Sequence, residues 1–159
     1  MAHADFLVEC LTLLKERIHT AVQTSGYAPK AAFERVLEKA DHMLFDLKLA
    51  DPCLHRRYTD VENSGILRNF AVLAKSGKPF TVRTPLIPGV TDTEENLTAI
   101  AEILQQNGVK EIELLPYNRA AGGKYAAIGR KFQPEYDEDR VVTPRLELFA
   151  ACGIRAITL

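Results

Sequence analysis

The sequence of residues 42–48 is HMLFDLK, and this stretch is the strongest indication of the fold class. Its middle is apolar at consecutive positions, so both faces of a strand here would be apolar until the strand reaches Asp46. Such runs are typical of parallel strands covered by helices, because the crossover connections pack helices onto the sheet. The stretch therefore predicts an α/β protein with a buried strand over 42–47 that ends in charged residues.

Helical and strand patterns alternate on both sides of this stretch. The expected helices span 4–17, Pro29 to Ala40, a short turn from Asp51 to Arg57, 64–76, a segment capped by Thr91 or Asp92 that stops at Asn107, and 143–151. The expected strands span 19–24, 42–47, 79–87, 111–115 and 154–159. This alternation predicts a parallel sheet with right-handed crossovers. We expect a single domain over residues 1–159, with about five strands covered by helices.

Two further features concern the loops and the edge of the sheet. The segment with Gly122-Gly123, Lys124 and Tyr125 predicts a loop, and the acidic stretch 135–139 predicts a solvated linker or loop. The pattern begins on a helix with no strand before it, as in the later part of a barrel. This leaves one sheet edge exposed, which natural proteins usually avoid. We therefore expect a second copy or another partner to cover that edge.

Composition and charge narrow the function classes. The chain is 47% hydrophobic and 26% charged, as in folded globular proteins, and its formal charge of −1 provides no attraction for nucleic acid or a membrane surface. No apolar run approaches the roughly 20 residues that span a bilayer, and no secretory signal is visible. Cys10, Cys53 and Cys152 are far apart, which argues against a disulfide framework and against a zinc site. We expect the reducing cytoplasm.

Polar residues gather where the predicted strands end, which is where ligands bind in βα folds. Asp46 and Lys48 are two apart and would point to one face of their strand. On an inner face this pair is costly unless a ligand engages it, but it can equally be a salt bridge that closes the strand end. Arg83, in an otherwise apolar strand, either extends to solvent or forks toward a carboxylate or a ribose.

Four strand-end strings together resemble a known family. They are QTSGY at 23–27, DLK at 46–48, RTPLIPGVTD at 83–92 and LLPY at 114–117. In this order and spacing they are similar to the radical S-adenosylmethionine (SAM) activating enzymes of glycyl radical enzymes, of which pyruvate formate-lyase activase is the best-known member. The resemblance covers about residues 6–159 and also includes residues 55–61 and Lys124-Tyr125 with Gly129.

The resemblance implies a fold, a chemistry and residue roles. The fold would be the C-terminal part of a radical SAM partial (βα)6 barrel of the TIM-like kind. Such oxidoreductases cleave SAM at a [4Fe–4S] cluster, and the resulting radical takes hydrogen from a glycine of a partner glycyl radical enzyme. Lys48 would contact the methionyl carboxylate of SAM, and Asp46 with Thr24 would lie by a monovalent cation. Arg83 would lie at the ribose or the bound glycyl loop, and Asn118 near the adenine.

The sequence also departs from the family pattern. The cluster motif C-x-x-x-C-x-x-C and a Gly-Gly-Glu-Pro stretch are absent, and Cys10, Cys53 and Cys152 do not match the cluster positions. Gln23 stands where the family has an acidic residue that helps to hold the cation, and Asn118 stands where a histidine is usual. We therefore expect a cluster only if a missing N-terminal segment is supplied, and we assign no catalytic residue and no metal ligand to this chain.

Three hypotheses remain open at this point. The chain is a portion of a radical SAM activating enzyme and inactive alone, or it is a truncated, non-catalytic half-barrel that binds a partner or associates with itself. The third is an unrelated βα-barrel enzyme that uses Lys48 as a Schiff-base amine. The third is disfavoured because the neighbouring Asp46 would keep the lysine charged rather than nucleophilic.

Overall fold

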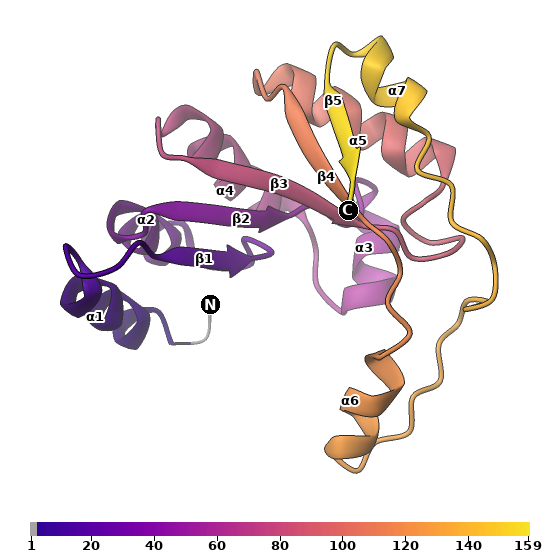
Figure 1. The fold of residues 1–159 in the computed structure, drawn as a ribbon, viewed down its shortest axis with the longest axis horizontal. Coiled ribbons are helices and arrows are strands. Elements are labelled where there is room, and N and C mark those ends of the chain that lie inside the picture. The colour runs from indigo at the N-terminus through magenta and orange to yellow at the C-terminus, as the bar shows by residue number, and fades with distance from the viewer. Residues whose placement is uncertain (1–2) are drawn as a thin grey trace.

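The structure is a computed structural model that describes residues 3–159, and its strands form one parallel sheet (Figure 1). The strands are β1 (Ala21–Thr24), β2 (His42–Asp46), β3 (Phe80–Pro85), β4 (Glu111–Leu115) and β5 (Arg155–Thr158), arranged in this order in space. The helices are α1 (Ala4–Leu14), α2 (Lys30–Lys39), α3 (Pro52–Thr59), α4 (Ser64–Lys75), α5 (Glu94–Gln106), α6 (Ala121–Ala127) and α7 (Leu146–Ala151). The predicted fold class, a five-stranded parallel sheet with crossover helices, is confirmed.

Among residues 3–159, helices cover one face of the sheet and leave the other open (Figure 1). In β2, Met43 and Phe45 are buried, whereas the alternate residues His42, Leu44 and Asp46 are half-buried, and β3 and β4 alternate in the same way. In Figure 1, α2, α4 and α5 lie behind the strands. The other side, here called the open face, carries Gln23, His42, Leu44, Asp46, Thr81, Arg83, Glu111, Glu113 and Arg155. The expectation that both faces of β2 are covered is therefore wrong, since Leu44 lies on the open face.

The core on the covered face is built around Phe45. Its ring contacts Phe33 of α2 at a centroid distance of 6.1 Å and Phe70 of α4 at 5.4 Å, and all three side chains are fully buried. Gly26, in the loop after β1, lies directly on this ring: a Cβ there would be 2.3 Å from Cζ of Phe45, and its φ is +75°. Both the backbone conformation and the close approach therefore require glycine at this position.

The start of α5 differs from the prediction. Thr93 is the N-cap and its hydroxyl accepts a hydrogen bond from an amide in the first turn, so the expectation that Thr91 or Asp92 caps the helix is wrong. These two residues instead hold the turn after β3. The Thr91 hydroxyl accepts from the amide of Ile87 at 2.6 Å, and the Asp92 carboxylate accepts from the amide of Gly89 at 2.6 Å. Thr91 and Asp92 thus close the loop that leads away from β3.

Other element ends also differ from the sequence patterns. The helix expected over 143–151 begins only at Leu146, because Arg145 has a left-handed backbone with φ of +47°. The segment around Gly122-Gly123, expected to be a loop, contains α6. The first helix ends at Leu14 rather than 17, and the predicted domain begins at residue 1, which lies outside the described residues. In residues 3–159, no helix combines the length and the apolar character needed to cross a membrane.

Candidate functional site

Asp46, at the end of β2, is the centre of a polar cluster on the open face. Its Oδ1 accepts hydrogen bonds from Nη2 and Nε of Arg83, at 3.0 and 3.3 Å. Its Oδ2 lies 3.6 Å from Nζ of Lys48 and accepts a hydrogen bond from Nε2 of Gln23 at 3.4 Å. Three strands or strand ends therefore direct polar groups at one carboxylate.

The strand register explains this cluster. Asp46 is aligned with Arg83 across the β2–β3 pair, so both side chains leave the sheet on the same face. Lys48 lies two residues beyond Asp46, and its contact with that carboxylate confirms that the two share a face. The side chains of Arg83 and Asp46 are only 13% and 14% exposed, and that of Lys48 is 31% exposed. Lys48 and Arg83 thus both contact one carboxylate, and charged groups of this kind also bind anionic ligands.

Two of the six residues predicted for the site, Thr24 and Asn118, lie outside the cluster; the other four are Gln23, Asp46, Lys48 and Arg83. Thr24 is aligned with Phe45, so its side chain leaves β1 on the covered face, and its hydroxyl accepts a hydrogen bond from the amide of Gly26 at 2.9 Å. Asn118 is exposed after β4 and accepts a hydrogen bond from the amide of Ala120 at 2.9 Å. The structure thus brings together Gln23, Asp46, Lys48 and Arg83, while the binding role of every one of the six stays a prediction.

The sequence reasoning missed Glu113. This residue is aligned with Arg83 across the β3–β4 pair and lies half-buried on the open face. Arg83 is therefore flanked by a carboxylate-bearing residue on each neighbouring strand. The alternation of apolar and acidic residues in β4 contains this signal, but only the register shows that Glu113 is next to Arg83.

Buried asparagines, also missed, fix the loop that follows β2. The Asn96 side chain donates to the carbonyl oxygen of Lys48 at 2.9 Å and accepts from the amide of Ala50 at 2.9 Å. Asn63 donates to the carbonyl oxygens of Leu49 and Ala50, at 3.1 and 2.7 Å. These bonds hold the backbone of residues 48–50 and therefore the position from which the Lys48 side chain starts.

Lys48 also lies between two cavities. One, of about 250 Å³, includes Ser25, His55 and Thr59 in its lining. The other, of about 440 Å³, is bounded by residues 118–136, a segment that carries α6 and projects from the sheet in Figure 1 and is here called the arm. The cluster around Asp46 therefore adjoins space that a ligand can enter.

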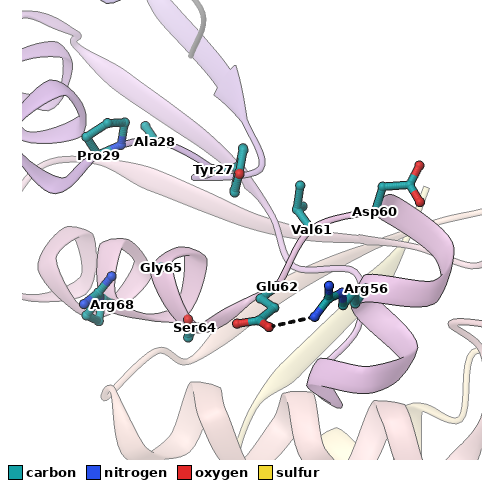
Figure 2. A pocket seen from close by; sticks show the side chains of 10 residues that line it. All are labelled: Tyr27, Ala28, Pro29, Arg56, Asp60, Val61, Glu62, Ser64, Gly65 and Arg68. Atoms are coloured by element: carbon teal, nitrogen blue, oxygen red, sulfur yellow. Dashed lines mark hydrogen bonds and ion pairs between the residues drawn. The ribbon is translucent and has the colours of Figure 1, made fainter.

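A larger cavity, of about 750 Å³, lies further out, between the loop after β1 and the α3–α4 connection (Figure 2). Arg56 and Glu62 point toward each other across part of it and form an ion pair at 3.3 Å, while Arg68 lies further along α4. Asp60 adds a second carboxylate to the lining. The two arginines of this cavity are therefore balanced by two carboxylates, and none of the six predicted site residues lines it.

The base of the arm is closed by Tyr117. Its hydroxyl donates to Oε1 of Glu138 at 2.5 Å and lies 3.2 Å from the hydroxyl of Tyr136, and the two tyrosine rings meet edge to face at 5.6 Å. Burial, together with the hydrogen bond to Glu138, raises the pKa of Tyr117 above its ordinary value. The phenol therefore stays protonated and keeps donating.

The thiols do not form a metal centre. In the part of the chain that the structure describes, no group of three or more His, Cys, Asp or Glu side chains could hold a metal ion. Cys10 and Cys152 are half-buried, Cys53 is exposed on α3, and all three are free thiols. This donor set does not fit a [4Fe–4S] cluster, which needs three thiolates close together.

No family model matches the chain, but comparison with individual known proteins finds relatives that are activating enzymes. The chain is 36% identical over 134 residues to the trans-4-hydroxy-L-proline dehydratase activating enzyme of Clostridioides difficile, which covers 82% of this chain and 44% of the relative. It is 39% identical over 127 residues to the isethionate sulfite-lyase activating enzyme of Nitratidesulfovibrio vulgaris, with coverages of 76% and 41%. The chain thus spans less than half the length of these curated relatives.

Solved structures agree with the sequence matches. A crystal structure of a domain of pyruvate-formate lyase-activating enzyme from Bacteroides vulgatus superposes with a TM-score of 0.77 at 28% identity, covering 99% of this chain and 92% of that one. Streptococcus suis SuiB bound to S-adenosylmethionine gives a TM-score of 0.60 at 14% identity over 98% of this chain and 34% of that one, a likeness of fold alone. By sequence and by fold, the chain is similar to glycyl-radical-enzyme activating enzymes, whose curated members it matches over less than half of their length.

Proposed function

We propose that this chain is part of a radical SAM activating enzyme that generates a glycyl radical on a partner enzyme in the cytoplasm. The observation that supports the proposal most directly is the cluster in which Lys48 and Arg83 meet at Asp46 on the open face. Ligands of βα folds bind beyond the strand ends, and this cluster lies at two neighbouring strand ends. The activating-enzyme relatives support the same assignment.

The cluster fits SAM as a ligand. The Lys48 ammonium would hold the methionyl carboxylate, and Asp46, next to Gln23, would keep Lys48 and Arg83 in place or face a monovalent cation. Arg83 would reach the ribose or the glycine-bearing loop of the partner, and Asn118, exposed after β4, would lie near the adenine. When bound, SAM would supply the group that abstracts hydrogen from a glycine of the partner. The chain's own residues bind and orient it.

The described residues do not fit the iron–sulfur cluster that this chemistry requires. Their three cysteines are far apart in sequence and form no group that could hold a metal. In this proposal the cluster ligands therefore come from outside residues 3–159, and the chain alone is inactive.

Calorimetric titration of SAM into the purified chain tests the proposal. Lys48→Gln should weaken binding about tenfold, because a charge-assisted contact to the carboxylate is worth about 1.4 kcal/mol. Lys75→Gln, a matched change on the exposed end of α4, should leave the affinity unchanged. Absence of SAM binding by the unaltered chain, or equal affinities for the two variants, would contradict the assignment of Lys48.

A second proposal is a non-catalytic half-barrel that binds a partner or a second copy. It is motivated by α1 and β1: β1 pairs only with β2 among the described strands, and Phe6 and Leu13 of α1 are 69% and 71% exposed. Sedimentation at micromolar concentration checks it. A concentration-dependent dimer that Leu13→Asp abolishes is expected, and a monomer throughout would refute the self-association part.

A further inference from the structure

The cavity between the arm and the strand ends, here called the arm cavity, has an apolar and aromatic lining. From the body of the protein it is lined by Leu49, Ile87 and Val90, and from the arm by Tyr125, Phe132 and Tyr136. Its volume of about 440 Å³ lies in the range of small-molecule sites. Apolar walls on one side and aromatic rings on the other favour a flat, apolar group between them.

The aromatic wall is held in place by contacts at both ends of the arm. The rings of Tyr125 and Phe132 lie 5.1 Å apart, so the two sides of the arm contact each other. At its base, Tyr136 is held by the ring and hydroxyl of Tyr117. Glu135 also forms an exposed ion pair with Arg57 of α3 at 3.1 Å, a weak contact between the returning side of the arm and the body. The wall is therefore formed before any ligand arrives, which lowers the entropic cost of binding.

The charge of the arm cavity sets it apart from the cavity in Figure 2, whose arginines are balanced by carboxylates. Its charged lining residues are Lys48 and Lys131, and no carboxylate from the described part of the chain lines it. Lys48 is already 3.6 Å from Asp46, whereas Lys131 has no ion pair among the residues that the structure describes. One positive charge is therefore left uncompensated. A lysine ammonium is a point charge, so it suits a single carboxylate without demanding a forked geometry.

We infer that the arm cavity binds a planar aromatic group that carries a carboxylate. The ring lies between Phe132 and Tyr125 on the arm and Leu49 and Val90 on the body, and the carboxylate meets the ammonium of Lys131. This goes beyond the proposed function, since it concerns a second ligand and uses none of the contacts of Asp46. The same chemistry is offered by a free aromatic acid and by an aromatic residue followed by an acidic one in a peptide.

Titrations of the ¹⁵N-labelled chain, followed by amide chemical shifts, test the inference. The probes are N-acetylphenylalanine, its neutral amide, acetate, and a peptide capped at both ends with an internal Phe-Asp pair. The acid should shift the amides of Leu49, Val90 and Lys131, the neutral amide should bind at least fivefold more weakly, and acetate should not bind. Binding of the peptide as well as the acid identifies a protein source, and binding of the acid alone identifies a small molecule.

Two variants make the inference refutable without disturbing the fold. Lys131→Gln should weaken binding of the acid about fivefold and leave binding of the neutral amide unchanged, since the exposed lysine contributes only its charge. Lys110→Gln, also exposed but before β4, should change neither affinity. Equal affinities of acid and amide, an unaffected Lys131→Gln variant, or shifts that gather around Phe6 and Leu13 instead would overturn the inference. Because SAM is absent from these titrations, failure of the proposed function would not affect their outcome.

Discussion

Replacing Asp46 by asparagine should destabilise the protein by about 2 kcal/mol. Removing one partner of a buried ion pair costs about 3–5 kcal/mol, because the other charge is left unpaired. Asp46 and Arg83 are 14% and 13% exposed on the open face, so solvent reduces this cost to about 2 kcal/mol. The variant also leaves Lys48 and Arg83 close together with no carboxylate between them.

Urea unfolding followed by far-UV circular dichroism measures this cost, since the chain has no tryptophan. With a slope of about 2 kcal/mol per molar urea, the midpoint should fall by about 1 M. Asp139→Asn provides the control: this aspartate also pairs with an arginine, Arg119, at 2.8 Å, but the two side chains are 84% and 65% exposed. An exposed pair should contribute under about 0.5 kcal/mol. Equal midpoints for the two variants would refute the reasoning from burial.

Three further outcomes are expected. Gly26→Ala should lower the free energy of unfolding by about 2 kcal/mol more than Gly108→Ala in urea titrations, because both have positive φ but only the first Cβ meets a buried ring; equal losses would refute the packing argument. Hydrogen bonds from the backbone amide and the hydroxyl of Thr20 lower the pKa of Asp41, so Asp41→Asn should lower the free energy of unfolding at pH 6. This loss should shrink as the pH falls below the carboxyl's ordinary pKa of 3.8, and a loss that does not change with pH would contradict the reasoning. Tyr117→Phe should speed tryptic cleavage within the arm while Tyr58→Phe does not, and unchanged cleavage would show that the hydroxyl does not hold the arm.

The sequence predicted the fold class, because helical and strand patterns alternate along the chain. It also predicted the shared face of Asp46 and Lys48, because side chains two residues apart on a strand point to the same face. It did not predict that Arg83 lies between Asp46 and Glu113, since strand register depends on how distant segments pack. An apolar run also fits burial on either or both faces, which is why Leu44 was placed wrongly. Thr91 and Asp92 also have side chains that can cap a helix, but both are used within the turn after β3, so the helix begins after Thr93.

The short helix α6 was missed for a related reason. Gly122-Gly123 disfavours a helix locally, and no apolar face marks one, so only the surrounding contacts of the arm decide the conformation. The positions of Thr24 and Asn118 were not predictable from the sequence either. Their expected roles rested on the similarity of short sequence strings, whereas the direction of the Thr24 side chain depends on the pleat of β1 and that of Asn118 on the loop after β4.

Charges on the open face also determine how the strands align. Moving β2 or β3 by a single residue would turn Asp46 and Arg83 into the apolar layer beneath the helices and would expose Phe45 and Val82 to water. A misaligned pairing therefore carries two energetic costs: burial of charged side chains on the covered face and exposure of apolar ones on the open face. A redesign that made the open face apolar would remove this penalty, and the chain could then settle in several alignments of similar energy. The polar groups at the strand ends thus serve folding fidelity even when no ligand is bound.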